Sequence, residues 1–449
     1  MTVAENLAQT CLAATLTPAM EATAETLLID IAGICVAARQ TDFLAAARAG
    51  VDAGGTCTAI GLAGGFSPAD AAMLNGTAAH GEDFDDTFEG GPVHAGAVIL
   101  PTVLAAAERH AASGRTALRA IAIGSEIACR LSVVVPKATH KAGFHPTAVF
   151  GAIGAAAAAG TVLGLSQTQL VNALGIAGSM ASGIIEYLAE GTWTKRLHPG
   201  WAAQSGYRAA RLAQGGFTGP RTLFEGTHGL FHGFARKIPD DWSALLDGFG
   251  RDWVAASIAF KPYACGTMIH PYIDCARRIA ARGLDLAQIV SIECETSDGI
   301  VHRLWEPLDA KQNPPNGYAA KFSIPYGIAA GLALGHAGLA AFADGQVADE
   351  KLRNLARRVR YVVDPGNPYP KQFTGHVRIA LADGRVIEER QPHFRGGANE
   401  PLTRAEIVEK FRLNCRHGGW EAARSERLLA FAQSLFASDE PLSLAEFGV

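Results

Sequence analysis

The sequence lacks the features typical of proteins that bind nucleic acids, span membranes or enter secretion. It contains no run of five or six like charges, and 39 Lys and Arg against 43 Asp and Glu give a net charge of −4, so no basic surface for nucleic acid is expected. The first twenty residues include no Lys or Arg, so no secretory signal is expected. The longest apolar stretch, residues 147–165, is mostly Ala and Gly and too weakly hydrophobic to favour lipid. We predict a cytoplasmic protein whose partner is a small molecule.

Paired cysteines and nucleotide-binding motifs are absent as well. The eight cysteines are scattered and form no C-x-x-C pair, so buried free thiols are expected rather than disulfides or an iron–sulfur cluster. The sequence contains no G-x-G-x-x-G, no Walker loop and no G-x-S-x-G. These absences argue against a dehydrogenase, an ATPase and a serine hydrolase.

Small residues and helical patterns dominate what is present. Aromatic residues make up 8% of a chain that is 49% hydrophobic, and 50 of its 449 residues are Gly. Ser67, followed by Pro68 and Asp70, predicts the start of a helix that runs to His80. Helical periodicity of this kind fills the first two-thirds of the chain and resumes near its end.

The pattern changes to strands from about residue 285. Alternation with period two occurs at residues 289–295, 359–362 and 377–381, and Asp383-Gly384 after the last of these predicts a hairpin. We predict a mainly α fold with two domains. The large all-helical domain comprises residues 1–267 and 397–449, and a smaller α+β domain, residues 268–396, is inserted before the C-terminal helices.

Acidic residues crowd the stretch from His80 to Thr87. Four carboxylates lie within five residues: Glu82, Asp83, Asp85 and Asp86. If the helix continues through this stretch, His80, Asp83 and Thr87 share one face. No third ligand follows at a recognisable spacing, so we expect no bound metal, and a solvated acidic helix end is the alternative. Four carboxylates so close together are costly unless something pairs with them.

Two further polar stretches flank the Ala- and Gly-rich segment. His145, directly before Pro146, lies at the expected start of a helix, where the dipole disfavours imidazolium and leaves a neutral base. Lys195 and Arg196 belong to a compact cationic segment, residues 192–200, that is suited to holding carboxylates. A packed histidine without a role and a solvated loop are the respective alternatives.

The remaining candidates come from the predicted domain changeover and from the second domain. Residues 260–270 include Lys261 and His270, and such changeovers commonly form crevices; a plain linker is the alternative. Tyr326 offers a hydroxyl, with a core position as its alternative. Histidines, carboxylates, lysines and a tyrosine together suit proton transfer at a carbon next to a carboxylate, where a base removes the proton and cations stabilise the charge.

At these stretches the chain resembles the MmgE/PrpD family over nearly its whole length. The markers, in order, are residues 80–87 with His94, 143–146, 194–198, 260–263 with His270, and 321–326. The resemblance implies a homodimer with a large all-α domain, a smaller α+β domain and an active site in the cleft between them. It also implies chemistry without a cofactor on small polycarboxylates. The family's pocket residues fall on Asp83, Thr87, His94, His145, Lys195, Lys261 and Tyr326.

Among the activities of that family, an epimerase is favoured by elimination. The family's cis-aconitate decarboxylases have a histidine five residues after the lysine equivalent to Lys261, where this chain has Gly266. The chain also looks unlike the 2-methylcitrate dehydratases around Lys195. We therefore predict an isomerase similar to iminodisuccinate epimerase, which inverts an acidic C–H centre of a small imino- or amino-dicarboxylate. The alternatives are a hydro-lyase of the 2-methylcitrate dehydratase type, a cis-aconitate-type decarboxylase and a non-catalytic member of the family.

This reaction assigns a role to each candidate. His145 and Lys195 are the predicted proton-transfer pair, Asp83 is expected to orient a histidine, and Tyr326 is a second acid. The predicted substrate-binding residues are Thr87, His94, Arg196, Lys261 and His270.

Overall fold

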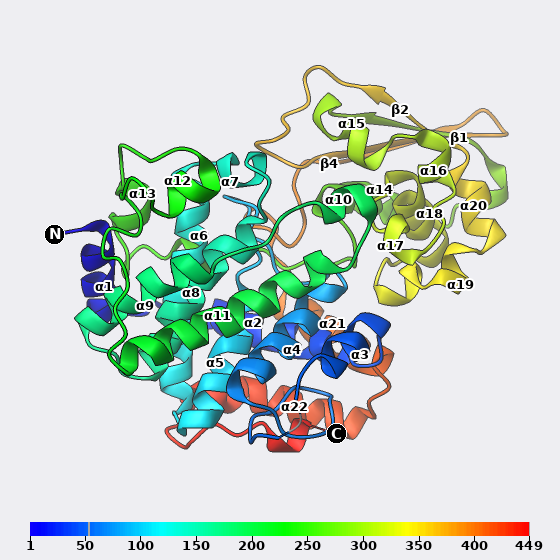
Figure 1. The fold of residues 1–449 in the computed structure, drawn as a ribbon. Coiled ribbons are helices and arrows are strands. Elements are labelled where there is room, and N and C mark those ends of the chain that lie inside the picture. The colour runs from blue at the N-terminus through cyan, green and yellow to red at the C-terminus, as the bar shows by residue number, and fades with distance from the viewer. Residues whose placement is uncertain (53, 449) are drawn as a thin grey trace. The chain divides into compact units, whose positions relative to one another are not determined.

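The larger of two compact units is all-helical. The computed structural model describes residues 1–52 and 54–448. The chain divides into unit 1, residues 1–259 and 403–449, and unit 2, residues 260–402. The helices of unit 1 (Figure 1) are α1 (Val3–Ala13), α2 (Pro18–Ala38), α3 (Asp42–Ala49), α4 (Pro68–Gly81), α5 (Gly96–His110), α6 (Gly114–Val134), α7 (Ala138–Lys141), α8 (Pro146–Val162), α9 (Gln167–Met180), α10 (Tyr187–Glu190), α11 (Thr194–Gln214), α12 (Leu230–Ala235), α13 (Ser243–Leu246), α21 (Arg404–His417) and α22 (Ala422–Ser434).

Helix α8 is the central helix of unit 1. It packs against α5, α6, α9 and α11, and every residue from 146 to 160 is buried, as expected for a helix that is apolar all round. A Cβ on Gly154 would lie 2.5 Å from the carbonyl oxygen of Gly124 in α6. Since a side chain at such a contact would push the helices apart, this close approach requires glycine. Among the described residues, no helix is both long and apolar enough to span a membrane.

Local signals and distant contacts together set the ends of α4 and α11. Helix α4 begins as predicted, with the Ser67 Oγ accepting a hydrogen bond from the Asp70 N–H. It ends at Gly81, one residue beyond the predicted end at His80, so the helical face considered for His80, Asp83 and Thr87 does not form. A Cβ on Gly81 would lie 2.2 Å from the ring of Phe43. Lys195 lies in the first turn of α11 rather than on a loop.

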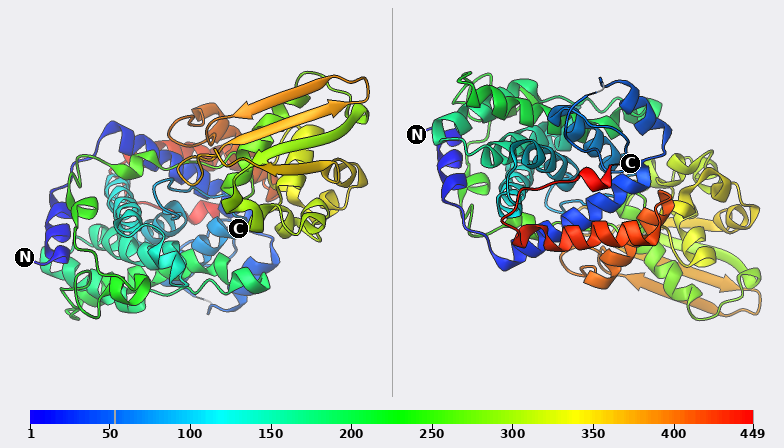
Figure 2. Two further views of the ribbon diagram at one scale, coloured as in Figure 1. Left: turned by 90° about the horizontal axis from the view of Figure 1, so that it is seen from above. Right: turned by 90° about the horizontal axis from the view of Figure 1, so that it is seen from below.

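The two ends of the chain meet within unit 1. Helix α21, near the C-terminus, packs against α2, near the N-terminus (Figure 2). The Nζ of Lys410 in α21 lies 2.7 Å from the Oδ1 of Asp30 in α2, and both side chains are buried. The last helices therefore complete the helical unit, as the predicted insertion requires.

Unit 2 is built on one four-stranded sheet. Its strands are β1 (Ile289–Thr296), β2 (Val359–Val363), β3 (Gly375–Leu381) and β4 (Val386–Gln391), in the order β2-β1-β3-β4. Strand β1 is parallel to β2 and antiparallel to β3, and β3 and β4 form the predicted hairpin around Asp383-Gly384. The helices are α14 (His270–Ala280), α15 (Asp298–Leu304), α16 (Leu308–Gln312), α17 (Gly317–Ala320), α18 (Ile324–Leu334), α19 (Asp344–Val347) and α20 (Glu350–Ala356). The predicted class, mainly α with a smaller α+β region, is confirmed.

Unit 2 starts earlier and ends later than the predicted limits of 268 and 396. The backbone N–H of Phe260 donates to the Gly396 carbonyl at 2.9 Å, and that of Gly266 donates to the Lys321 carbonyl at 2.9 Å. These bonds join residues 260–266 to unit 2. Their partners lie 55 or more positions away in the sequence, so local patterns do not reveal them.

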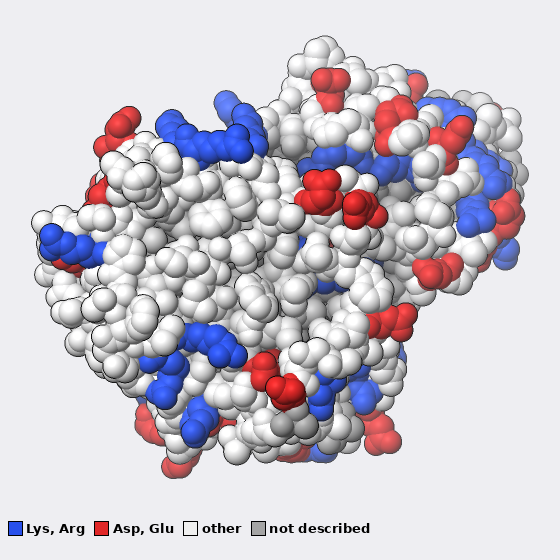
Figure 3. All heavy atoms as spheres, viewed as in Figure 1, with Lys and Arg blue, Asp and Glu red and all other residues white. Residues whose placement is uncertain are grey.

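Several charged side chains of unit 1 lie inside it. Figure 3 shows that the face over α8 and α11 carries few Lys, Arg, Asp or Glu side chains in its central part. By contrast, Asp30, Asp85 and Asp86 are at most 1% exposed. Buried charges must be paired or hydrogen-bonded, and their partners define the site described next.

Candidate active site

His80 lies in the last turn of α4 and is 1% exposed. Its Nδ1 is 2.7 Å from the Oδ2 of Asp85. The chain turns back after the helix through Asp83, whose φ of +54° is a left-handed conformation that is uncommon outside glycine. This turn brings Asp85 to His80, so Asp85, rather than the predicted Asp83, orients a histidine.

The carboxylates of this turn have separate partners. Asp83 Oδ1 lies 3.0 Å from the Lys195 Nζ. Asp86 Oδ2 accepts a hydrogen bond of 3.0 Å from the N–H of Gly96, the first residue of α5, where the helix dipole favours negative charge. Since Asp85 and Asp86 are fully buried, the alternative of a solvated acidic helix end does not hold.

His94 is fixed by the same turn. Its Nδ1 lies 2.6 Å from the backbone carbonyl oxygen of Asp86 and 3.4 Å from the Oδ2 of Asp85. A carbonyl oxygen only accepts, so the Nδ1 of His94 carries a proton and a neutral ring has its lone pair on Nε2. The backbone N–H of His94 donates to the Thr147 Oγ1 at 3.2 Å. The side chain is 13% exposed.

His145 is the N-cap residue of α8 and is held from both sides. Its backbone N–H donates to the Gly183 carbonyl at 2.8 Å, and its Nδ1 lies 3.2 Å from the Nδ1 of His198. Burial lowers the pKa of His145 well below its usual value, and His80, His198, Lys195 and His94 add to the effect. The predicted neutral base is therefore present, but burial rather than the helix dipole is its main cause.

Helix α11 supplies Lys195, Arg196 and His198. Lys195 and His198 are one turn apart, which places them on the same side of the helix. Burial lowers the pKa of His198 to about 4, with smaller contributions from His80 and Lys195. The Arg196 guanidinium instead lies over the Phe43 ring at 4.4 Å.

The histidines of unit 1 form one cluster. The ring centroids of His80 and His94 are 4.8 Å apart, and those of His80 and His145 are 5.7 Å apart. One ring nitrogen each of His80, His94 and His145 lies within 4.8 Å of the others. Thr87 is also buried, and its backbone pairs with Ala259 in an isolated bridge. Four predicted site residues of unit 1, Asp83, His94, His145 and Lys195, therefore belong to one polar cluster around His80 and His198.

The predicted residues of unit 2 lie in a different setting. The Tyr326 hydroxyl donates to the Ala341 carbonyl oxygen at 2.5 Å, and burial raises the pKa of this phenol. His270 begins α14, and its Nε2 lies 3.1 Å from the Cys265 carbonyl oxygen. Lys261 is 1% exposed. The Tyr326 hydroxyl therefore makes its hydrogen bond within unit 2, which agrees with the alternative that Tyr326 is a core residue.

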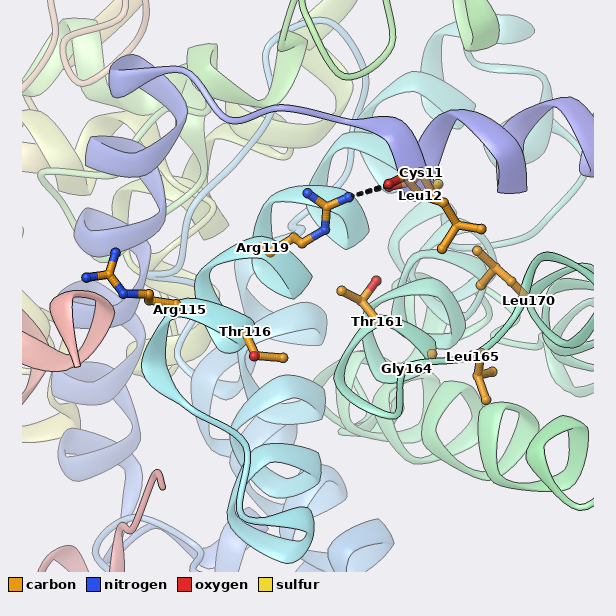
Figure 4. A pocket seen from close by; sticks show the side chains of 10 residues that line it. Cys11, Leu12, Arg115, Thr116, Arg119, Thr161, Gly164, Leu165 and Leu170 are labelled. Carbon is orange, nitrogen blue, oxygen red and sulfur yellow. Dashed lines mark hydrogen bonds between the residues drawn. The ribbon is translucent and has the colours of Figure 1, made fainter. Parts of the chain in front are cut away.

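A cavity of about 380 Å³ opens elsewhere in unit 1, between α1, α6 and the C-terminal end of α8 (Figure 4). The Arg119 guanidinium donates to the carbonyl oxygens of Cys11, Leu12 and Ala14, and Arg115 pairs with Asp439 at 2.8 Å. Gly160 in its wall is fourteen residues along α8 from Pro146, or roughly 20 Å. Its arginines therefore anchor α1 and the C-terminal segment, at the far end of α8 from His145.

Three residues of the cluster were not predicted as site residues: His80, Asp85 and His198. The sequence carried a signal for one of them, because His198 follows Lys195 by one helical turn. It carried none for Asp85, since the geometry depends on where α4 ends and how the chain turns at Asp83.

An all-helical unit with a buried cluster of histidines beside a lysine–aspartate pair defines a candidate acid–base site. Sequence models of the MmgE/PrpD N-terminal domain and the MmgE/PrpD C-terminal domain match residues 5–242 and 263–434. The chain belongs to the MmgE/PrpD family, as predicted.

Several named relatives are cis-aconitate decarboxylases. The chain is 31% identical to that of Mus musculus over 357 residues, which cover 77% of this chain and 72% of the relative. It is 30% identical to that of Homo sapiens over 372 residues, covering 80% and 75%. It is 28% identical to that of Aspergillus terreus over 387 residues, covering 80% and 76%. The more specific similarity to iminodisuccinate epimerase stays a prediction.

Proposed function

We propose that this chain is a lyase that acts on a small polycarboxylate by proton transfer at a carbon next to a carboxylate. The observation that carries the proposal is the pair of buried histidines, His145 and His198, whose pKa values lie below the usual range, in the same interior as the Lys195 ammonium. The decarboxylase names of the relatives support a lyase more than the epimerase predicted from the sequence.

The same residues serve the steps that decarboxylation and dehydration need. In decarboxylation the C–C bond to a carboxylate breaks, CO₂ leaves, and the electron pair left on carbon takes a proton from an acid such as Lys195. In dehydration a neutral base such as His145 removes a proton from carbon, and hydroxide leaves with another proton as water. Asp83 holds the Lys195 ammonium in place for either step.

Dehydration is the second candidate. Gly266 occupies the position at which the family's cis-aconitate decarboxylases have a histidine. Its backbone N–H donates a hydrogen bond to the Lys321 carbonyl in unit 2. A reaction that does not need this histidine, such as loss of water from a β-hydroxy polycarboxylate, fits the departure. Iminodisuccinate epimerisation remains the third outcome to test.

One experiment separates the three reactions. The purified chain is incubated in D₂O with cis-aconitate, with 2-methylcitrate and with iminodisuccinate, and products are followed by NMR. Release of CO₂ with a five-carbon unsaturated dicarboxylate supports decarboxylation, and a new alkene from the hydroxy acid supports dehydration. Deuterium at the α-carbon of iminodisuccinate without an alkene would support the epimerase and overturn the lyase. Lys195→Ala is the matched inactive variant. If the wild-type chain turns over none of the three substrates, the assignment is wrong.

A further inference from the structure

Three histidines of unit 1 converge from separate parts of the sequence. His80 comes from the last turn of α4, His94 from the segment before α5 and His145 from the N-cap of α8. One ring nitrogen of each lies within 4.8 Å of the other two. The sequence offered no third ligand beside His80 and Asp83, and the folded chain supplies two further histidines instead.

Each of these rings is held at its Nδ1. The partners are the Asp85 carboxylate for His80, the Asp86 carbonyl for His94 and the His198 ring for His145, at 2.7, 2.6 and 3.2 Å. A histidine that binds a metal ordinarily donates its other N–H to a carboxylate or carbonyl, which fixes the ring and raises the basicity of the ligating nitrogen. The structure shows such an Nδ1 partner, a carboxylate or a carbonyl, for His80 and His94.

The Nε2 of His80 points to a ligand. It is buried and has no hydrogen-bond partner among the residues that the structure describes. A buried polar atom without a partner costs free energy, and a buried imidazole lone pair close to two other imidazoles can be satisfied by one cation that all three rings share. The 13% exposure of the His94 side chain gives such an ion a way in.

The donor set selects the kind of ion. Three imidazole nitrogens suit late first-row ions such as Zn²⁺, Co²⁺, Ni²⁺ and Cu²⁺, whereas Ca²⁺ and Mg²⁺ prefer oxygen. Zn²⁺ with three histidines and an open fourth position is a familiar arrangement, with Zn–N distances of about 2.0 Å and ligand nitrogens therefore roughly 3.3 Å apart. The ring nitrogens must close by up to about 1.5 Å from their present separation to reach this distance.

We propose that His80, His94 and His145 form a binding site for a divalent transition-metal ion, with Zn²⁺ as the probe. The ion takes a lone pair from each ring, including the one on His145 that proton transfer requires. Bound Zn²⁺ therefore inhibits the reaction, and this consequence rests on the proposed function, whereas the binding itself does not.

A second pair of histidines must be removed before binding is measured. His228 and His232 are exposed, four residues apart, and their ring centroids are 6.0 Å apart, so they can hold a metal weakly on the surface. His232→Asn eliminates this pair without touching the cluster and is the background for all measurements.

The test titrates the His232→Asn chain with Zn²⁺ by calorimetry and with Co²⁺ by visible absorption. We expect one ion per chain and a Co²⁺ spectrum of four- or five-coordinate nitrogen ligation. Adding His94→Asn should weaken Zn²⁺ at least about 100-fold. Adding Asp85→Asn, which keeps all three ligands, should weaken it about 10- to 100-fold. Equal affinity with and without His94→Asn, or no binding to the His232→Asn chain, overturns the proposal.

If a cluster variant fails to fold, X-ray absorption of the zinc-loaded His232→Asn chain counts the imidazole ligands of the bound ion instead. Three imidazole nitrogens at about 2.0 Å are expected, and two or fewer overturn the site. Turnover measured with and without Zn²⁺ separates the two proposals. Binding with no turnover of any substrate contradicts the lyase alone, whereas turnover without binding contradicts the metal site alone.

Discussion

The two units bury similar polar residues in opposite ways. In unit 2, the Tyr263 hydroxyl donates to Asp274, and the guanidinium groups of Arg277 and Arg395 lie against the same pair, with Arg395 Nε 3.1 Å from Asp274 Oδ1. Burial raises the pKa of Tyr263 to about 12, so its proton stays in place. In unit 1, burial lowers the pKa values of His145 and His198 instead, which leaves basic nitrogens without charge.

This difference separates a network that stabilises a fold from a cluster that is able to react. Charged groups of both signs neutralise one another in unit 2, and each added hydrogen bond makes the arrangement more rigid. In unit 1 burial favours the neutral forms of His145 and His198, which lie close to other imidazole rings and to one ammonium group, so a proton has several possible acceptors. A shifted pKa therefore indicates a candidate functional group in unit 1, whereas in unit 2 it reflects a stabilising network.

The largest expected effect comes from the reactive cluster. His145→Asn removes the proposed base, and turnover of the substrate identified above should fall about 10²- to 10⁴-fold, the usual contribution of general acid–base catalysis. Steady-state kinetics measures the loss. His110→Asn is the matched control, because His110 is also a histidine of unit 1 but is bonded to Tyr207. Equal turnover by wild type and His145→Asn would remove His145 from the mechanism.

The network of unit 2 should respond in stability rather than in chemistry. Asp274→Ala leaves Arg395 and the Tyr263 hydroxyl without their anion, and breaking a buried pair in this way typically costs about 3–5 kcal/mol. Denaturant unfolding measures the change. The exposed pair of Asp383 and Arg385, 2.6 Å apart, provides the control, since Arg385→Ala, which leaves the turn residues Asp383 and Gly384 in place, should cost less than about 1 kcal/mol. Similar losses for the two variants would contradict the comparison.

Acid should destabilise unit 1 through its histidines. The folded pKa of His198 is about 4, below its usual value of 6.5, so the unfolded chain binds the proton more readily and stability falls as the pH drops from 6.5 towards 4. The loss attributable to His198 is about 2 kcal/mol at about pH 5, and His145 adds to it in the same direction. Unfolding free energies are measured against pH with a chelator present. His198→Gln should flatten this dependence, and an unchanged slope would show that other groups cause it.

The smallest expected effect concerns Tyr326. Tyr326→Phe removes one hydrogen bond to the Ala341 carbonyl and should lower the unfolding free energy by about 1 kcal/mol. The structure predicts a change in stability rather than in turnover. A fall in turnover of a hundredfold or more at unchanged stability would instead support the acid role predicted from the sequence.

The sequence predicted those features that depend on neighbouring residues. The start of α4 at Ser67 and Pro68 and the hairpin at Asp383-Gly384 follow from local capping and turn chemistry, and His145 lies at a helix start for the same reason. Features that depend on distant contacts were missed. The N–H of Phe260 bonds to the Gly396 carbonyl, and this contact between residues far apart in the sequence carries unit 2 beyond its predicted limits.

The candidate site shows the same division between local and distant information. The polar stretches around His80, His145 and Lys195 were found by composition, and the structure joins them. That Asp85 rather than Asp83 meets His80 depends on a left-handed residue after the helix. That His94 completes a trio of histidines depends on the packing of α4, α5 and α8. Neither could be derived from spacing along the chain.

The close approach of α8 to its neighbours also sets a limit for anyone who wishes to redesign this protein. His145 lies at the start of α8. Main-chain contacts at Gly124, Gly154 and Gly206 set the distances from α8 to α6 and α11. Replacing any of these glycines with a larger residue would shift α8 and the His145 imidazole together. Changes aimed at new substrate preferences should therefore leave α8 unaltered, because it positions His145, the proposed base.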